Sequence, residues 1–227
     1  MPNGTSLPGS ETAYDYGKVA RKRENAFTPR FLQINKVLNR PAASLIVRAL
    51  FKTKITPNQV TVASFFIGLA GAGCFGLGTR GSFIAGGLLT QLSSIVDCAD
   101  GMLARARGTS NDFGGYLDLL LDRVNEYLLI TGAVLGQYRY SGREIDLVLG
   151  IFALGLYFLL TTQFYLAKNL IRDERRGEAA ENRGWLMFLI GLFAVINRLD
   201  IGIIVLMLIT LGGNIGLLFR FFRFGKI

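Results

Sequence analysis

Four aspartates at helical spacing are the residues of this sequence best suited to chemistry. They are Asp97, Asp100, Asp118 and Asp122, and they fall in a region otherwise apolar enough to sit in lipid. At 3.6 residues per turn, the first two share one helix face, and so do the last two. Carboxylates are costly to place in a membrane, so intramembrane carboxylates are functional candidates by default.

The segment between the two pairs is rich in turn-forming residues, with Gly108 near its start and Gly114 at its end. Two antiparallel helices would then present their carboxylates to each other, as in a site for hard divalent cations. The structural alternative is neutralisation by Arg105 and Arg123. Two arginines cannot balance four aspartates and Glu126, so the pattern favours bound Mg²⁺ or Mn²⁺, with two ions suiting phosphoryl transfer.

The same residues form a longer pattern with fixed gaps. The motif D-x2-D-G-x2-A-R-x8-G-x3-D-x3-D runs from Asp97 to Asp122, and all its fixed positions are occupied. This motif resembles the signature of the CDP-alcohol phosphotransferase family. The resemblance implies a metal-dependent membrane enzyme of phospholipid biosynthesis. Such an enzyme transfers a substituted phosphate from a CDP-linked alcohol to an acceptor alcohol and releases CMP.

The resemblance also implies roles for the motif residues. Asp97, Asp100 and Asp118 would be metal ligands, and Asp122 would be the general base, also touching a metal. The chain contains no histidine, which independently favours a carboxylate as the base. The residues expected beside the CDP group are Gly101, Ala104, Arg105, Gly114, Thr56 and Pro57.

The nucleotide residues also have simpler explanations. Gly101 and Ala104 would leave room for the nucleotide, but small residues equally serve close helix packing. Arg105 would face the diphosphate, or its side chain could simply reach the membrane interface. Thr56 and Pro57 suit the N-cap and first position of a helix, whose free N–H groups favour phosphate.

The donor and the acceptor are less well defined by the sequence. A lipid donor, CDP-diacylglycerol or an ether analogue, is the first expectation. Arg123 directly follows the last aspartate, as in the branch of the family that uses inositol phosphate, and a guanidinium matches a phosphate well. Segments 38–61 and 91–94 also resemble relatives that use soluble CDP-inositol, which is the alternative donor. Further candidate ligands of an acceptor phosphate are Lys168, Arg172, Arg175 and Arg183.

Composition defines the elements that must position these residues. Hydrophobic residues make up 51% of the 227 residues, and the mean hydropathy is +0.39, too apolar for an ordinary soluble domain. The net charge of +9 is better explained by membrane orientation and anionic lipid than by nucleic-acid binding. The two cysteines give no disulfide framework.

We therefore predict an all-α integral membrane protein with six transmembrane helices after an interfacial amphipathic helix. Residues 1–25 are expected to form a flexible polar tail, 26–55 a juxtamembrane amphipathic segment, and 56–227 the catalytic domain. Pro41 is expected to interrupt a helix or to begin a new one. The six predicted spans are 59–78, 82–106, 115–137, 145–168, 185–197 and 199–220.

Lysine and arginine placement predicts the orientation. Most of them fall on one side, whereas the other side holds Arg80, Arg139, Arg143 and Arg198. Both termini and the motif would then be cytoplasmic, in what we expect to be a prokaryotic plasma membrane. The family resemblance adds an expected homodimer. A cation transporter lined by acidic residues is the rival class, but it would spread its carboxylates through the membrane depth rather than gather them at one end.

Overall fold

A computed structural model describes residues 35–170 and 176–224 of this chain, and all regular secondary structure in these two ranges is helical. The predicted tail 1–25 and residues 26–34 of the juxtamembrane segment lie outside the described residues. The elements are η2 (Asn35–Asn39), α2 (Arg40–Leu50), α3 (Pro57–Gly76), α4 (Arg80–Arg107), α5 (Asp112–Ser141), α6 (Glu144–Leu170), α7 (Arg176–Val195) and α8 (Leu199–Phe224).

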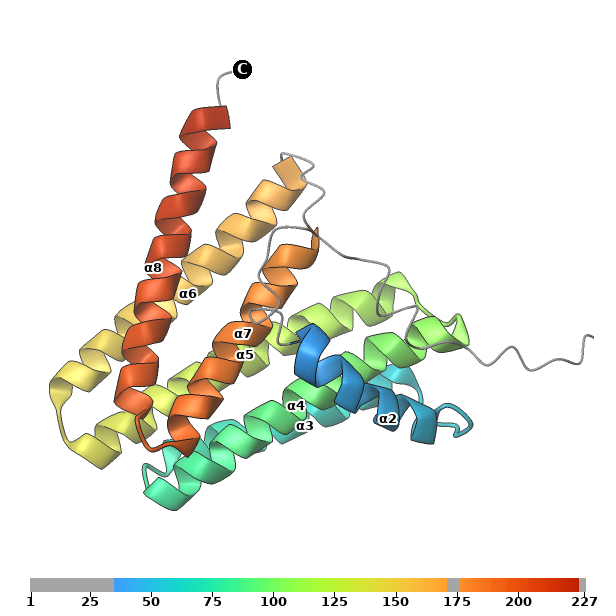
Figure 1. The fold of residues 1–227 in the computed structure, drawn as a ribbon, viewed down its shortest axis with the longest axis horizontal. Helices are drawn as coiled ribbons and strands as arrows, with labels where there is room; N and C mark the ends of the chain where they lie inside the picture. The colour runs from blue at the N-terminus through green and yellow to red at the C-terminus, as the bar shows by residue number, and fades with distance from the viewer. Residues whose placement is uncertain (1–34, 171–175, 225–227) are drawn as a thin grey trace, which may run out of the picture.

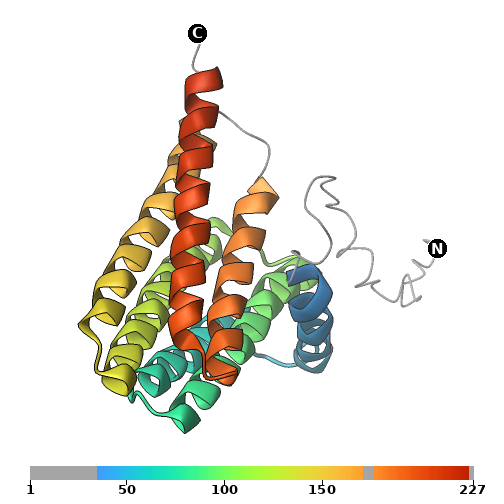
Figure 2. The same ribbon diagram turned by 60° about the vertical axis from the view of Figure 1, so that its left-hand side comes forward.

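The helices form two groups, and α5 and α7 each contact helices of both groups (Figures 1 and 2). In the first group, α3 packs against both α4 and α5, and α2 lies against α4. In the second group, α6 packs against α8, while α5 contacts α6 and α7 contacts α4 and α8. The motif helix α4 therefore belongs to the first group, and the motif helix α5 contacts both groups.

Two buried apolar clusters hold the helices together. Tyr157, Ile190 and Leu199 belong to the larger cluster, which joins the second group to the far halves of α3, α4 and α5. Val47 and Leu103 belong to the smaller cluster, which fixes α2 and the start of α3 to the C-terminal half of α4. The half of α4 that carries the first aspartate pair is thus held from the side by α2.

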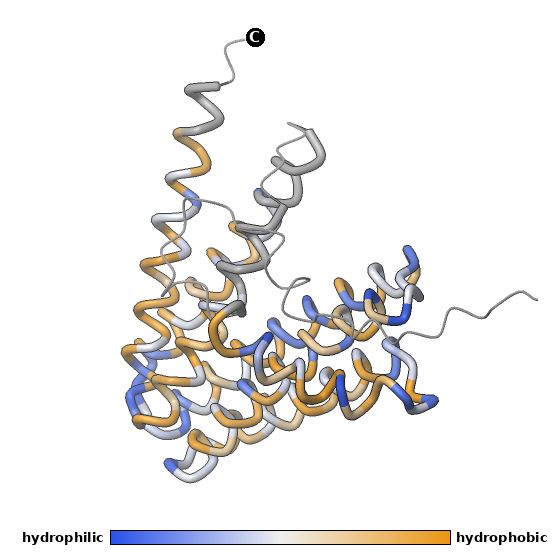
Figure 3. The backbone as a smooth tube through the Cα atoms, turned by 45° about the vertical axis from the view of Figure 1, so that its right-hand side comes forward, coloured by the Kyte–Doolittle hydropathy of each residue, from blue (hydrophilic) through white to orange (hydrophobic). Residues whose placement is uncertain are grey.

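Helices occupy all six predicted spans, but four of them are long and apolar enough to cross a membrane: α3, α4, residues Glu144–Gln163 of α6 and residues Leu199–Phe219 of α8. These four indicate a multi-pass membrane protein. Helix α5 falls short because the charged residues of the motif interrupt its apolar surface, visible as blue segments in Figure 3. The described apolar part of α7, Gly184–Val195, is shorter than a full span. The six-span prediction is therefore confirmed only as a multi-pass helical arrangement.

Local sequence signals account for the helix ends around the motif. Pro41 lies in the first turn of α2, as expected for a helix start. Thr56 caps α3: its hydroxyl accepts from the backbone N–H of Gln59, and the Gln59 side chain accepts from the backbone N–H of Thr56. Gly108 ends α4 in the left-handed conformation at φ 65°, which allows the chain to turn directly into α5.

Candidate functional site

Three of the four aspartates come together where α4 faces the start of α5. Asp97 and Asp100 lie on α4 and Asp118 lies on α5, and one carboxylate oxygen from each lies within 4.8 Å of the other two. Asp100 is buried, with 6% of its surface exposed, and the other two are half-buried. Three carboxylates this close repel one another strongly unless a cation lies among them.

Asp122 lies one helical turn beyond Asp118 on α5 and is half-buried. It is not part of the group of three whose oxygens meet. Its expected role as a base, and its expected contact with a metal, stay predictions.

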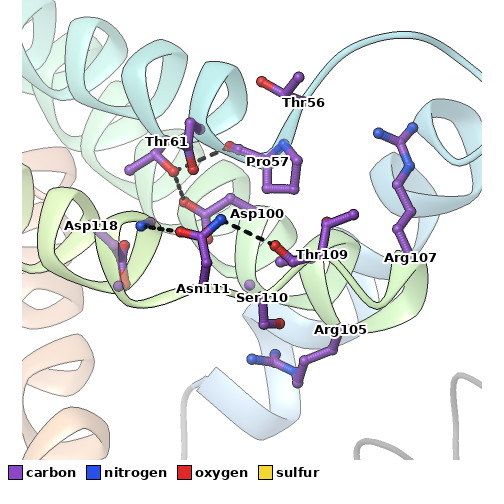
Figure 4. A pocket seen from close by; sticks show the side chains of 15 residues that line it. Thr56, Pro57, Thr61, Asp100, Arg105, Arg107, Thr109, Ser110, Asn111 and Asp118 are labelled. Carbon is purple, nitrogen blue, oxygen red and sulfur yellow. Dashed lines mark hydrogen bonds between the residues drawn. The ribbon is translucent and has the colours of Figure 1, made fainter.

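A cavity of about 530 Å³ opens beside the aspartates (Figure 4). Its walls come from the start of α3, the end of α4, the following turn and the start of α5. Asp100 and Asp118 both line it. All six residues expected beside the CDP group line it as well: Thr56, Pro57, Gly101, Ala104, Arg105 and Gly114. The cavity is large enough for a small ligand such as a nucleotide headgroup.

Two glycines of the motif, Gly101 and Gly114, shape this cavity because other side chains lie close to the position that a Cβ would take. A Cβ at Gly101 would lie 3.1 Å from Nη1 of Arg105, so the absence of a side chain lets that guanidinium fold back over the helix. A Cβ at Gly114 would lie 3.1 Å from Oδ1 of Asn58 on α3. Gly114 also donates its backbone N–H to Oδ1 of Asn111, the N-cap of α5, at 2.7 Å. Small residues therefore keep three segments close around the opening.

The two arginines at the end of α4 differ in their surroundings and leave the helix in different directions (Figure 4). Arg107 donates to the carbonyl oxygens of the segment that joins α2 to α3: to Leu50, to Ile55 at 2.5 Å, to Thr53 at 2.9 Å and to Phe51 at 3.1 Å. A cation at these carbonyls caps the C-terminus of α2. Arg107 thereby holds the chain leading into Thr56.

The residues proposed for an acceptor phosphate are only partly described. Arg123 is described, and its Nη1 lies 2.6 Å from Oε2 of Glu126, one turn further along α5. The side chain of Glu126 is 9% exposed, so this carboxylate is buried beside its partner. The side chains of Lys168 and Arg183, and residues Arg172 and Arg175 entirely, lie outside the described residues.

Sequence reasoning assigned no site role to Thr61 or Arg107, and both line the cavity. Asn58, directly after Pro57, lines it as well, as do Gly115 and the turn residues Thr109, Ser110 and Asn111. The hydroxyl of Thr61 donates to Oδ2 of Asp100 at 2.5 Å, across 39 residues of sequence. The helical spacing of Thr61 from Pro57, one turn apart, was the available signal for that residue. No pattern in the neighbouring sequence indicated the backbone carbonyls to which Arg107 donates.

The donor atoms of the three aspartates suit a divalent cation. Three carboxylate oxygens converge, and no thiol or imidazole belongs to the group. Such an all-oxygen set is the one that Mg²⁺ and Mn²⁺ prefer. A cation in the group would also compensate the charge of the buried Asp100 carboxylate. The residues present therefore fit a divalent metal ion.

Comparisons with known proteins point to one family. A family model described as CDP-alcohol phosphatidyltransferase matches residues 54–215, well over half of the chain. The chain is 42% identical over 90 residues to a bifunctional IPC transferase and DIPP synthase of Thermococcus kodakarensis, covering 40% of this chain and 20% of that protein. It is 36% identical over 91 residues to an archaetidylinositol phosphate synthase of Pyrococcus horikoshii, covering 40% of this chain and 47% of that protein. The chain thus spans between a fifth and about half of the length of these curated relatives.

Solved structures share the fold. A crystal structure of Mycobacterium tuberculosis phosphatidylinositol phosphate synthase with CDP-DAG bound matches with a TM-score of 0.63 at 20% identity, over 78% of this chain and 91% of that chain. The same enzyme in complex with manganese and citrate gives a TM-score of 0.62 at 20% identity, over 78% and 87% of the two chains. At this level of identity, the likeness concerns the fold.

Proposed function

Because this chain belongs to the CDP-alcohol phosphatidyltransferase family, we propose that it transfers a substituted phosphate from a CDP-linked alcohol to an acceptor alcohol and releases CMP. The class of enzyme follows from the family itself: the chain is a transferase of substituted phosphate groups acting in phospholipid biosynthesis. The identity of the two substrates, the metal and the roles of single residues are part of the proposal.

One observation carries the proposal. The carboxylates of Asp97, Asp100 and Asp118 converge within 4.8 Å, and two of the three line the same cavity as every residue expected beside the CDP group. A cation transporter would not need a cavity of this size beside its carboxylates at one end of its helices. A phosphoryl-transfer site needs a cation-binding group next to a nucleotide-sized cavity.

The metal ligands in this proposal are Asp97, Asp100 and Asp118, with Mg²⁺ or Mn²⁺ bound, and two ions if Asp122 also contributes. The family and a neighbour solved with manganese support a divalent ion. A divalent cation bound there would neutralise charge on a diphosphate and on the departing nucleotide phosphate. The protein's part is to hold the carboxylates together before substrate arrives.

The remaining roles are assigned by position. The first turn of α3, capped at Thr56, places the positive end of its helix dipole at the cavity and would favour a phosphate there. Arg105 faces the same cavity and would bind the diphosphate. Asp122, one turn past Asp118, would accept the proton of the attacking hydroxyl. A carboxylate is the expected base because the chain contains no histidine.

We propose a lipid donor, CDP-diacylglycerol or an ether analogue, and inositol phosphate as the acceptor. The shared fold with an enzyme solved with CDP-DAG and the similarity to an archaetidylinositol phosphate synthase support this choice. The similarity to the bifunctional IPC transferase supports a second candidate, a soluble CDP-alcohol donor of the CDP-inositol type. In either case Arg123 would bind the acceptor phosphate, with guanidinium donors other than the Nη1 that lies on Glu126 or after leaving it.

We also propose that the protein is a homodimer in a prokaryotic plasma membrane, with both termini and the cavity on the cytoplasmic side. The bias of lysine and arginine supports the orientation. On this view α2 lies at the cytoplasmic membrane surface. Its exposed Leu45 and the buried Val47 face opposite sides, as expected for a helix between lipid and protein.

The test is CMP release by the purified protein in lipid nanodiscs with Mg²⁺ or Mn²⁺. Donors would be CDP-diacylglycerol, its ether analogue and CDP-inositol, and acceptors would be inositol phosphate, glycerol phosphate, serine and inositol. The expected result is release with a lipid donor and inositol phosphate, lost in Asp122→Asn although that variant folds and binds the donor. Release with CDP-inositol alone would favour the second candidate. Ion flux without CMP release from any pair would overturn the proposal.

A further inference from the structure

A hydroxyl on α3, which itself carries none of the four aspartates, contacts the acidic group. Thr61 donates a hydrogen bond to Oδ2 of Asp100 at 2.5 Å, and both side chains are almost fully buried, at 4% and 6% exposed. This separation is typical of a hydroxyl donating to an ionised carboxylate. The contact therefore joins α3 directly to a proposed metal ligand on α4.

The Thr61 hydroxyl has one proton and two acceptors within reach. The carbonyl oxygen of Pro57, one turn earlier in α3, lies 3.2 Å away. Other buried threonine hydroxyls bond within their own helix: Thr90 to Gly86 at 2.8 Å, and Thr210 to Leu206 at 2.8 Å. For Thr61, the nearer of the two acceptors is the Asp100 carboxylate, which belongs to another helix. The hydroxyl proton is therefore donated to this carboxylate.

Thr61 is itself held by a series of hydrogen bonds through three helices. Ser64 donates to the carbonyl oxygen of Thr61 at 2.7 Å, and Ser93 of α4 donates to the carbonyl oxygen of Ser64 at 2.8 Å. Asn125 of α5 donates to the Ser93 hydroxyl at 3.3 Å. Gly68 makes room for this amide, because a Cβ there would lie 2.1 Å from its nitrogen. The supporting bonds fix Thr61 relative to both motif helices.

We propose that Thr61 is a positioning residue that sets the orientation of the Asp100 carboxylate for metal binding, a role that rests on the proposed function. A carboxylate offers about four lone-pair sites, and the hydroxyl takes one of them on Oδ2. With its plane fixed, the carboxylate would keep one oxygen within 4.8 Å of an oxygen of Asp97 and of an oxygen of Asp118. Hydrogen bonds of this kind to metal ligands commonly change metal affinity or activity by about 10–100-fold.

The test compares Thr61→Val, which keeps the shape and removes the hydroxyl, with the matched control Thr90→Val on α4. Mn²⁺ binding is followed by electron paramagnetic resonance titration, and CMP release is measured in parallel. We expect Thr61→Val to weaken Mn²⁺ binding about 10–100-fold and to lower kcat by a similar factor. At saturating Mn²⁺ the KM for the donor should change by less than about two-fold, because the hydroxyl of Thr61, although it lines the cavity, donates its proton to Asp100. Thr61→Ser should restore both, and Thr90→Val should resemble the wild type.

Wild-type Mn²⁺ affinity and kcat in Thr61→Val would overturn the proposal, as would Thr61→Ser being as impaired as Thr61→Val. If Thr61→Val fails to fold, the pair Thr61→Ser and Thr61→Ala, which differs only by the hydroxyl, gives the same comparison. If the wild type binds Mn²⁺ but releases no CMP with any donor, the proposed function fails. The Mn²⁺ titration then still decides the role of Thr61, and absence of Mn²⁺ binding by the wild type overturns it.

Discussion

Two buried aspartates near opposite ends of α5, Asp100 and Asp146, are equally hidden from solvent, each 6% exposed, yet their partners differ. Asp146, in the first turn of α6, accepts hydrogen bonds from Ser141 at 2.5 Å, from Gln137 at 3.2 Å and from the Arg143 guanidinium at 3.0 Å. A guanidinium and two neutral donors meet its charge within the protein, at the turn that joins α5 to α6.

Asp100 has a different environment. It accepts a hydrogen bond from a neutral hydroxyl, and its nearest acidic neighbours are two further carboxylates within 4.8 Å. It also lines a cavity of about 530 Å³. Burial alone therefore does not separate a structural carboxylate from a functional one. The discriminating property is whether the protein supplies the compensating charge or gathers more charge of the same sign beside an opening.

The sharpest test of this contrast removes one carboxylate from the acidic group. Asp118→Asn should lower CMP release by at least about 1,000-fold, since a bound metal supplies several kcal/mol of charge stabilisation in phosphoryl transfer. Its melting temperature in metal-free buffer should equal or exceed that of the wild type, because a like charge is removed. Steady-state kinetics and thermal unfolding in detergent measure both. The exposed Asp112→Asn on the same helix is the control, and a large loss of stability in Asp118→Asn would contradict the contrast.

A second test separates two arginines two positions apart on α4. Arg105→Gln should raise the KM for the CDP donor by about 10–100-fold, through loss of a charge-assisted bond to the diphosphate, with little change in melting temperature. Arg107→Gln should instead lower the melting temperature by several degrees, because four backbone carbonyls lose their donor. The reverse pattern would mean that Arg107 binds the nucleotide and Arg105 is structural.

At the other end of α5, removal of a buried carboxylate is expected to lower stability without lowering turnover. Asp146→Asn should lower the melting temperature by about 4–8 °C, corresponding to about 2 kcal/mol for lost charged hydrogen bonds. CMP release per folded molecule should not change. Asp200→Asn is the control, since Asp200 is 31% exposed and lies 3.8 Å from Arg143, so its loss should shift the melting temperature far less. Loss of turnover in folded Asp146→Asn would show that the two ends are coupled.

The smallest effect is expected from a single methyl group in the motif. Gly101→Ala places a Cβ about 3.1 Å from the Arg105 guanidinium, which must move by a few tenths of an ångström. We expect the KM for the donor to rise roughly 3- to 10-fold, with kcat nearly unchanged, because ground-state binding is weakened. Gly73→Ala on α3 is the control, since its Cβ would meet nothing within 4 Å. An unchanged KM would show that the position of Arg105 tolerates this shift.

Local features of the chain were predictable because each depends on residues close in sequence. The capping box at Thr56, the helix start at Pro41 and the turn at Gly108 all follow from neighbouring residues. The helical spacing of the aspartates likewise predicted which of them share a face. Three of the four carboxylates indeed meet, and the six expected nucleotide residues share one cavity with two of them.

Features that depend on contacts between distant segments were not predictable. No local pattern pairs Thr61 with Asp100 across 39 residues, or directs Arg107 to carbonyls more than 50 residues earlier. The number of spans was uncertain for a related reason. The charged side chains of α5 lower its mean hydropathy, so its composition alone does not indicate a membrane span. The helix nevertheless packs against α3 and α6, which are apolar enough to cross a membrane.

The left-handed glycine at the end of α4 also bears on how the protein enters the membrane. Each of the four aspartates lies closer in sequence to Gly108 than to the far end of its own helix. If α4 and α5 insert as a hairpin whose turn remains cytoplasmic, as proposed, none of these carboxylates has to be translocated through the hydrocarbon layer. The fold thus keeps its most costly side chains on the side where the chain is synthesised.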